Sequence, residues 1–377
     1  VTISGGSSER YRNLPPLTPT YYSPPGLYND YASAVREGVS IPVIVAGRIT
    51  HPAEAEAILS AGAADAVAMT RALIADPHFP RKVMEGRADD IRLCSGASEG
   101  CIGRVTMGDV MTCIQNPVIG REAELAEVTP VASPKRVVVV GGGVAGLEAA
   151  RMAALRGHTV TLFEAERRTG GQLAVLVRAP ERINYAQIGR WLETQARKAG
   201  ADLRLGQRAT TEAILGERPD SVVIASGSKP RSLSVPRAAG THVVSVEDVL
   251  LGRVEPRGRC VVVDYHGHMP GPNVAEFLLD AGHAVEIVSR LFMVGIDIED
   301  RLRISVYRRL LEKGAILTPL TFVRAIEPGF LQVEHTLTGE RRAIAADTVV
   351  EALGGRPDNA VYDELRASAP SLDVHLV

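Results

Sequence analysis

The sequence has little net charge, few aromatic side chains and only four cysteines. Among its 377 residues, 42 Lys and Arg nearly balance 44 Asp and Glu, aromatic residues make up 4%, and hydrophobic residues make up 45%. The near-zero charge excludes the basic surface that recruits nucleic acid or an anionic membrane. The cysteine count excludes a disulfide-rich miniprotein, and the hydrophobic content excludes a disordered chain. This length predicts two or three domains.

Long hydrophobic runs and targeting signals are also absent. No run reaches the roughly 18 to 20 apolar residues that cross a bilayer, and the opening VTISGGSSERY lacks the basic flank and apolar stretch of a signal peptide. We therefore predict a cytoplasmic protein. Both ends are strand-like, VTIS at the start and LDVHLV at the end. Because a chain end inside a buried strand leaves ladder hydrogen bonds unpaired, both termini are expected to be truncated.

The first region alternates strands and helices. Apolar runs at 42–46 and 66–69 predict buried parallel strands, and an Ala-rich stretch at roughly 52–59 predicts the helix between them. This pattern fits a barrel or an open α/β sheet. Small and basic residues follow both strands at their carboxyl ends, where a TIM barrel binds phosphate, and this favours the barrel. The candidate phosphate ligands are Gly47, Arg48, Thr70 and Arg71, with solvated loop arginines as the alternative.

A glycine-rich turn between a strand and a helix indicates a dinucleotide site. The apolar run VVVV at 137–140 leads into GGGVAG at 141–146, the helix that follows ends at Gly157, and the next strand ends at Glu164. In this fingerprint the glycines permit a tight turn, close approach to the pyrophosphate and close helix packing, while the acidic residue accepts a hydrogen bond from a ribose hydroxyl. The helix N-terminus favours the phosphates. The candidate ligands are Gly141, Gly143, Ala145, Gly146 and Glu164.

Two later motifs indicate which dinucleotide is bound. A second glycine loop, RTGGQL at 168–173, follows Glu164, and ASGSKP at 225–230 ends a later strand. The pairing resembles the two-dinucleotide-binding-domain flavoproteins of the glutathione reductase type, whose first fingerprint holds FAD. The resemblance adds Gly171, Gln172, Ala225 and Gly227 to the candidate FAD ligands. The Gly-Asp pair that completes the FAD site in such proteins is missing, and its place would follow LDVHLV.

An inserted unit at 231–340 has its own strand, helix and strand. A dinucleotide site there would need a glycine after the strand at 260–263, and Asp264 stands in that place. A carboxylate beside a phosphate is electrostatically costly. We therefore do not expect an intact NAD(P)H site in this unit.

Three of the four cysteines lie within twenty positions of one another. Cys94, Cys101 and Cys113 belong to a polar, Gly-rich segment, whereas Cys260 belongs to an apolar strand. In a cytosolic chain this spacing points to metal rather than to disulfides. An iron–sulfur cluster, which typically takes four thiolates, competes with zinc and with unrelated buried thiols.

Motifs along nearly the whole chain occur in the order of one known family. They are PVIVAGRI, MTRALIADPHF, the cysteine run, CIQNP at 113–117, and GGGVAG…GGQL. The chain resembles the multidomain FMN, iron–sulfur and FAD branch of the old yellow enzyme family, which contains trimethylamine dehydrogenase, 2,4-dienoyl-CoA reductase, and demethylases of dimethylglycine and N-methylproline. The resemblance implies an FMN-binding barrel, a [4Fe-4S] segment and a half that binds FAD or ADP. It also implies that the four residues after the barrel strands hold the FMN phosphate and that Cys94, Cys101 and Cys113 ligate the cluster.

One cluster ligand is missing from the family pattern. The spacing in the dienoyl reductase is C-x2-C-x3-C-x11-C, and Ala97 occupies the second position here. A three-iron cluster, a replacement ligand such as Glu99 or water, and loss of the cluster remain open.

The predicted fold class is α/β: the C-terminal part of a TIM barrel, an iron–sulfur-type linker, and a two-dinucleotide-binding-domain (Rossmann-like) half. The predicted parts are the barrel portion at 1–88, the cysteine segment at 89–132, the first part of the FAD domain at 133–230, the inserted unit at 231–340, and the return to the FAD domain at 341–377.

The resemblance implies a flavin-dependent oxidoreductase with a small-molecule substrate. Oxidative demethylation or dehydrogenation of an N-methyl amine or amino acid, with electrons passed to a carrier protein, is the favoured activity. NAD(P)H-dependent reduction of activated C=C bonds is the first alternative, and a non-catalytic cofactor-binding remnant is the second. An electron-transfer protein and a second copy of the chain are the candidate protein partners.

No catalytic residue is assigned, because most of a barrel of about 250 residues would precede Val1. The 377 residues alone are therefore expected to be inactive. Five tyrosines near the N-terminus form either an aromatic wall for a cationic amine or packing on the barrel rim. They are Tyr11, Tyr21, Tyr22, Tyr28 and Tyr31.

Overall fold

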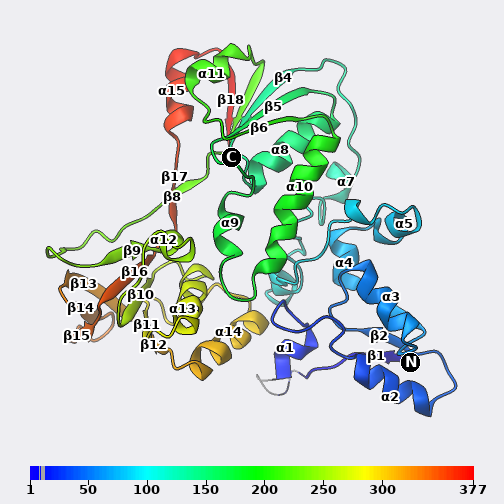
Figure 1. Cartoon of the computed structure of the whole chain (residues 1–377), viewed down its shortest axis with the longest axis horizontal. Helices are drawn as coiled ribbons and strands as arrows, with labels where there is room; N and C mark the ends of the chain where they lie inside the picture. The colour runs from blue at the N-terminus through cyan, green and yellow to red at the C-terminus, as the bar shows by residue number, and fades with distance from the viewer. Residues whose placement is uncertain (8, 10–12) are drawn as a thin grey trace. The chain divides into compact units, whose positions relative to one another are not determined.

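The computed structural model describes residues 1–7, 9 and 13–377, which fold into mixed α/β structure in two compact units (Figure 1). The first unit contains Val1–Ala174, Asn184–Gly227 and Pro357–Val377, and the second contains Val175–Ile183 and Ser228–Arg356. The five-part division made from the sequence stays a prediction. Among the described residues, no helix is both long and apolar enough to span a bilayer.

A three-stranded parallel sheet with the order β1-β2-β3 begins the first unit. Its strands are β1 (Thr2–Ile3), β2 (Ile44–Ala46) and β3 (Ala66–Ala68). Its helices are α1 (Leu14–Leu17), α2 (Asn29–Gly38), α3 (Pro52–Ser60) and α4 (Thr70–Ala75). Helix α3 begins where His51 and Glu54 form a capping box. Val43, Val45 and Ile58 are buried in one apolar cluster, so this sheet and α3 share a core.

Short helices carry the chain from these strands to the next sheet. They are α5 (Phe79–Met84), η2 (Ala88–Asp90), η3 (Glu99–Gly103), α6 (Arg104–Thr106) and α7 (Glu122–Leu125). Ala72, Phe79 and Ile91 form a small buried cluster between α4, α5 and the residues after η2. Element η3 is a single π-helical turn that contains Cys101, and π-turns are frequent at functional sites.

A five-stranded parallel sheet with the order β18-β7-β4-β5-β6 completes the first unit. Its strands are β4 (Arg136–Val140), β5 (Thr159–Glu164), β6 (Asp202–Leu205), β7 (Ser221–Ile224) and β18 (Asp373–Leu376). The helices that follow in this part of the chain are α8 (Val144–Leu155), α9 (Gln172–Leu176), η4 (Ile183–Tyr185), α10 (Ala186–Lys198), α11 (Thr211–Gly216) and α15 (Ala360–Ser368). From β4 the chain goes to β5 on one side and returns to β7 on the other. The carboxyl end of β4 is therefore the switch point where such sheets bind nucleotides.

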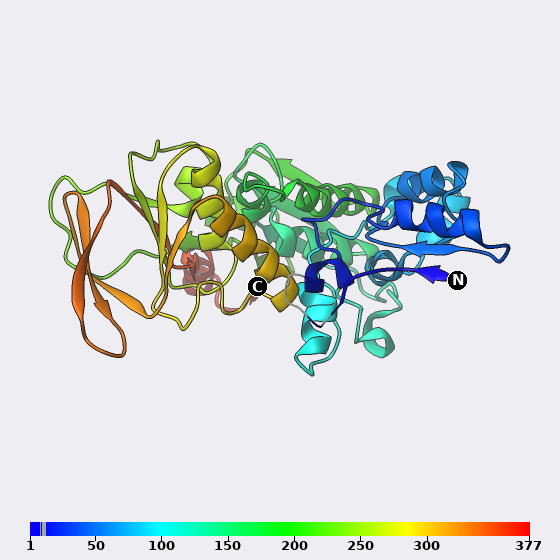
Figure 2. The same ribbon diagram turned by 90° about the horizontal axis from the view of Figure 1, so that it is seen from below.

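The second unit has a five-stranded parallel sheet with the order β12-β11-β10-β16-β9. Its strands are β9 (Val243–Ser245), β10 (Cys260–Asp264), β11 (Val285–Val288), β12 (Ile316–Thr318) and β16 (Thr348–Ala352). An antiparallel sheet of β13 (Thr321–Glu327), β14 (Phe330–His335) and β15 (Arg341–Ala345) packs on one face, as the shared cluster of Val263, Val323 and Val333 shows. Figure 2 shows this sheet, in orange, on the far side of the parallel sheet from α13 and α14. The helices are α12 (Val246–Leu250), α13 (Pro270–Asp280) and α14 (Asp300–Glu312). Strands β8 (Ser228–Pro230) and β17 (Gly355–Pro357) pair where the chain enters and leaves the unit.

Candidate functional site

The residues that follow β2 and β3 converge on one cavity of about 170 Å³. Its lining includes the four residues predicted from the sequence, Gly47, Arg48, Thr70 and Arg71. It also includes the hydroxyl-bearing residues Ser4, Thr18, Tyr28 and Thr50. Two guanidinium groups and several hydroxyl groups on one cavity form a donor set that suits a phosphate dianion.

The loop after β2 has an unusual backbone. Gly47 has a φ of 142°, and a Cβ there would lie 3.0 Å from Cδ2 of Tyr28, so glycine is required. Arg48 follows with a left-handed φ of 55° and donates a hydrogen bond to the carbonyl of Ser23. The hydroxyl of Tyr28 donates to the carbonyl of Pro16, which fixes its ring against the loop.

Arg71 connects the cavity with the cysteine segment. It lies in the first turn of α4 and donates from Nη1 to Oγ of Ser98 across 3.1 Å. Burial raises the pKa of the Cys94 and Cys101 thiols, and the Arg71 guanidinium counteracts this by favouring the two thiolates. The backbone amide of Gly96 adds a 3.4 Å hydrogen bond to Sγ of Cys94.

The three clustered cysteines act on one another electrostatically. Negative charge on Cys101 or Cys113 raises the pKa of Cys94. Within residues 1–7, 9 and 13–377, no three His, Cys, Asp or Glu side chains converge on a point that would hold a single metal ion. Ala97 is 3% exposed and offers no donor, so position 97 adds no fourth thiol to this segment.

Cys260 is separate from this group. It is fully buried in β10 of the second unit. Burial raises the pKa of its thiol to about 11. This agrees with its expected place in an apolar strand.

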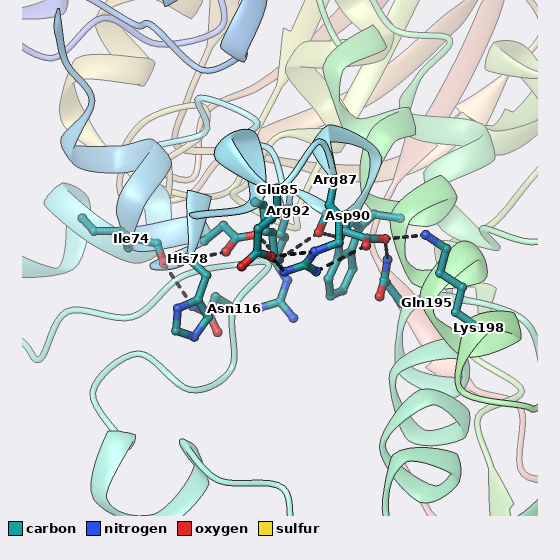
Figure 3. Close-up of polar contacts among 12 residues, drawn as sticks. Ile74, His78, Glu85, Arg87, Asp90, Arg92, Asn116, Gln195 and Lys198 are labelled. Atoms are coloured by element: carbon teal, nitrogen blue, oxygen red, sulfur yellow. Dashed lines mark hydrogen bonds and ion pairs between the residues drawn. The ribbon is translucent and has the colours of Figure 1, made fainter. Parts of the chain in front are cut away.

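Helix α4 also holds both ends of the cysteine segment, through residues that the sequence analysis did not single out (Figure 3). Asp76, the C-cap of α4, accepts the backbone amide of Arg92 at 2.9 Å and the ammonium of Lys82 at 2.6 Å. Buried Asn116 donates from Nδ2 to the carbonyl of Ile74 at 3.0 Å. The CIQNP motif contains Asn116 and the MTRALIADPHF motif contains Asp76, so these two motifs could have pointed to both residues.

The glycine turn after β4 has the geometry that its fingerprint demands. Gly141 has a φ of 104°, and a Cβ there would lie 2.3 Å from the carbonyl oxygen of Ala225. A Cβ on Gly146 would lie 1.9 Å from the carbonyl oxygen of Gly141, so helix and turn pack backbone to backbone. At Gly143 a Cβ would meet none of the described atoms within 4 Å, which leaves open space beside the N-terminus of α8. Ala145, in the first turn of α8, is exposed next to that space.

Glu164 lies against this turn. Its Oε2 accepts the backbone amide of Gly142 at 2.6 Å, and its Oε1 accepts that of Glu166 at 2.7 Å. The carboxylate is thereby held at the end of β5, where the second strand of a dinucleotide fold carries its ribose ligand.

The second glycine loop approaches the first. Gly171 has a φ of 51°, and a Cβ there would lie 3.1 Å from Cα of Gly143. Gln172 is exposed at the start of α9. Gly227 is exposed with a φ of 75°, whereas Ala225 is buried beside Gly141.

The described N-terminal tyrosines mostly form packing contacts. Tyr21 is 3% exposed and meets Tyr22 and Tyr185 at ring distances of 4.8 and 5.8 Å. Tyr31 is 66% exposed, and Tyr28 is the one described tyrosine of the group that lines the cavity. Tyr11 lies outside the described residues. The geometry therefore favours packing over an aromatic wall.

Comparison with known proteins identifies the family. Residues 21–90 match the NADH:flavin oxidoreductase / NADH oxidase family, and residues 86–217 and 135–370 match pyridine nucleotide-disulphide oxidoreductases. The chain is 39% identical to N,N-dimethylglycine/sarcosine dehydrogenase of Chromohalobacter salexigens, over 97% of this chain and 54% of that protein. It is 37% identical to NADH oxidase of Thermoanaerobacter brockii, over 97% of this chain and 56% of that protein. A solved structure of 2-naphthoyl-CoA reductase matches with a TM-score of 0.90 at 29% identity, covering 100% of this chain and 56% of that one.

The chain belongs to the multidomain branch of the old yellow enzyme family. The predictions of the family and of an α/β fold with part of a TIM barrel and a dinucleotide-binding half are confirmed. The chain spans about half the length of the curated relatives it matches.

In this old yellow enzyme relative, the second unit has a carboxyl group where a dinucleotide turn would need a glycine. Asp264 is fully buried at the end of β10, and its Oδ1 accepts the backbone amide of Gly267 at 3.2 Å. Its Oδ2 is buried without a hydrogen-bond partner among the described residues. A Cβ on Gly271 would lie 2.8 Å from the Asp264 side chain, so helix α13 packs directly on the carboxyl group. Burial raises the pKa of Asp264 to about 6.

Proposed function

We propose that the complete protein oxidises an N-methyl amine or N-methyl amino acid, with electrons leaving through the cysteine segment to a carrier protein. Support comes from the 39% identity to a dimethylglycine/sarcosine dehydrogenase and the 35% identity to a probable N-methylproline demethylase of Rhizobium meliloti. The observation that carries the proposal is the convergence of both barrel loops on one cavity that α4 joins to the cysteine segment. A cytoplasmic location stays a prediction from the sequence.

The cavity is proposed to hold the phosphate of FMN. The guanidinium groups of Arg48 and Arg71 would neutralise its charge, the hydroxyl of Thr70 would donate a hydrogen bond, and Gly47 would let the backbone approach. Bound FMN would supply the redox chemistry by accepting a hydride from the substrate carbon. The charged lining orients the flavin by its phosphate end.

The glycine turn after β4 is proposed to hold FAD or ADP. Open space at Gly143 leaves room for a pyrophosphate beside the first turn of α8, whose amide groups would donate to it. Glu164 has accepting oxygens for a ribose hydroxyl. Gly171 and Gln172 border the same turn, and Ala225 and Gly227 follow β7 beside Gly141.

Cys94, Cys101 and Cys113 are proposed to ligate an iron–sulfur cluster through three thiolates. Arg71 beside two of them, and the Gly96 amide on Cys94, stabilise negative charge on sulfur. Position 97 offers no thiolate, so the cluster would have three irons or would take a replacement ligand such as Glu99 or water.

The second unit favours oxidation of an amine over NAD(P)H-driven reduction. Besides the buried Asp264, the first turn of α13 contains Pro270 and Pro272, which lack the amide hydrogens that would bind a pyrophosphate. A carboxyl group and two missing donors are poorly suited to a dinucleotide. The reductase activity is the alternative, and the relative from Thermoanaerobacter brockii is named an NADH oxidase.

Anaerobic reduction of the complete, purified protein tests this proposal. Flavin absorbance should bleach on addition of dimethylglycine, sarcosine or N-methylproline, and iron and acid-labile sulfide should co-purify with the flavin. Bleaching by NADH or NADPH but by none of the N-methyl compounds would favour the reductase. A colourless protein would favour the non-catalytic remnant.

A further inference from the structure

Helix α4 contacts the cysteine segment at three points. In the middle of the segment, Nη1 of Arg71 donates to Oγ of Ser98 at 3.1 Å. At the two ends, Asp76 accepts the backbone amide of Arg92 at 2.9 Å, and Asn116 donates to a carbonyl group of the helix at 3.0 Å. The middle contact differs from the other two, because the side chain of Arg71 also lines the cavity.

Ser98 has a backbone conformation that serine rarely adopts. Its side chain is buried, with the residue 4% exposed, and its φ of 66° is left-handed. Strained backbone of this kind persists where the surrounding contacts hold it in place. Here the hydrogen bond from Arg71 holds the hydroxyl group. Ser98 therefore joins a charged side chain of the cavity to a strained point in the cysteine segment.

The π-helical turn η3 begins directly after Ser98 and is closed on it. The carbonyl of Ser98 accepts the backbone amide of Gly103 at 2.9 Å, and the thiol of Cys101 donates to the same oxygen at 3.6 Å. Within the turn, the carbonyl of Gly100 accepts the backbone amide of Thr112 at 2.7 Å, so the turn also holds the residue before the third cysteine. The position of Ser98 is thereby linked to the positions of two of the three clustered cysteines.

We propose that Ser98 is a positioning residue that links occupancy of the cavity to the order of the π-turn. A guanidinium has five N–H donors, so an anion bound to the other nitrogen atoms of Arg71 leaves Nη1 on Ser98. The anion fixes the guanidinium, and the hydrogen bond to Ser98 then opposes opening of the turn. By thermodynamic linkage, an ordered turn strengthens anion binding by the same factor. The identity of the anion as the phosphate of FMN rests on the proposed function, whereas the contact between Arg71 and Ser98 does not.

Hydrogen exchange of the π-turn tests this link in the complete protein. The backbone amides of residues 99–106 should exchange about fivefold more slowly with FMN bound than after its removal, at equal iron content. Ser98→Gly is the decisive variant, because glycine adopts the left-handed φ without strain while the hydroxyl is removed. This variant should lose the effect of FMN on exchange. A slowing that persists in Ser98→Gly, or that is missing from the wild type with FMN bound, would overturn the proposal.

Thr106→Ala is the matched control for a general loosening of the turn. The hydroxyl of Thr106 donates to the carbonyl groups of Ile102 and Gly103, so it supports the same turn from its other end. The amides should exchange faster in this variant than in the wild type, and FMN should still slow them about fivefold. Loss of the FMN effect in Thr106→Ala as well as in Ser98→Gly would show that any loosening abolishes it, and the specific role of Ser98 would be wrong.

A comparison without ligand separates this proposal from the proposed function. In the FMN-free protein, Arg71→Gln and Ser98→Gly should each speed exchange of the same amides. The double variant should be no faster than the faster single variant, because both substitutions break one hydrogen bond. If FMN does not bind to the wild type, the phosphate site of the proposed function is wrong, and this comparison decides the role of Ser98. Effects that multiply in the double variant would show that the two residues act independently, which would overturn the proposal.

Discussion

The guanidinium of Arg71 donates a hydrogen bond to Oγ of Ser98 across 3.1 Å, and this contact joins the cavity after β2 and β3 to the cysteine segment. The same guanidinium favours the thiolates of Cys94 and Cys101. In the proposed function, this one side chain would serve two anions, a flavin phosphate on one side and thiolate sulfur on the other. A substitution at this position should affect both sites together.

Arg71→Gln should weaken FMN retention by tenfold or more, because a charge-assisted hydrogen bond to phosphate is worth about 1.5–3 kcal/mol. The measurement is the FMN content of the purified complete protein after dialysis, determined by flavin fluorescence. Iron content should fall in the same variant. Arg81→Gln, on the exposed face of α5, is the control and should keep its FMN. Normal FMN retention in Arg71→Gln would remove this residue from the phosphate site.

Alanine substitution at two glycines of the GGGVAG motif should affect different properties, stability at Gly146 and nucleotide binding at Gly143. Gly146→Ala forces a Cβ to within 1.9 Å of the Gly141 carbonyl oxygen, so it should destabilise the fold by about 1–3 kcal/mol and lower Tm. Gly143→Ala enters open space at an ordinary φ of −72°, so its Tm should stay unchanged. It should instead weaken the binding of FAD or ADP, because the methyl group occupies the place proposed for the pyrophosphate. Thermal unfolding and calorimetric titration with ADP separate the two effects, and wild-type ADP affinity in Gly143→Ala would contradict the site.

The sequence predicted those parts of the site that are local in the chain. The glycines at 141–146 and Glu164 belong to one strand–turn–helix–strand unit, and Arg48 and Arg71 each lie shortly after an apolar strand, so local patterns were enough to find them. The links between Asp76 and Arg92 and between Trp191 and Asp90 span 16 and 101 residues. No pattern of spacing encodes such pairs, because they depend on how α4 and α10 pack. Among the described residues, no three His, Cys, Asp or Glu side chains converge on a point that would hold a metal ion. Cysteine spacing in the sequence could not predict this, because it depends on the tertiary structure.

Asp264 should make stability depend on pH in an unusual direction. Its pKa is about 6 in the fold, against 3.8 for an ordinary Asp, so between these values the folded state binds the proton more tightly than the unfolded state. The contribution of Asp264 to the free energy of unfolding is therefore fully present below pH 3.8. It falls by about 1.4 kcal/mol for each pH unit as pH rises from 3.8 to about 6. Asp264→Asn should remove this loss and be the more stable protein at pH 7.

Other titratable groups lie around Asp264 and also change the pH dependence of stability. The test therefore uses the difference in unfolding free energy between Asp264→Asn and wild type. Burial lowers the pKa values of His266 and His268, so their contribution is lost on acidification, the opposite direction. Asp297 and Tyr307 also interact electrostatically with Asp264. Denaturant unfolding of Asp264→Asn and wild type at pH 4.5, 6 and 7.5 gives the difference, and Asp363→Asn, an exposed carboxyl on α15, is the control. A difference that does not change over this range would mean that Asp264 is ionised in the fold throughout.

Ala97→Cys should complete the thiolate set of the cysteine segment. Ala97 is 3% exposed and directly precedes Ser98, the hydrogen-bond partner of Arg71, so a sulfur there would join the segment that contains the other three thiols. If the cluster is held by three thiolates, the fourth should raise the iron and sulfide retained after gel filtration and change the electron paramagnetic resonance signal of the oxidised protein. Ala97→Val enlarges the same buried position without a thiol, and overpacking of that kind costs about 1–3 kcal/mol. Because only the cysteine variant can bind iron at this position, equal iron content in the two variants would show that position 97 does not face the cluster.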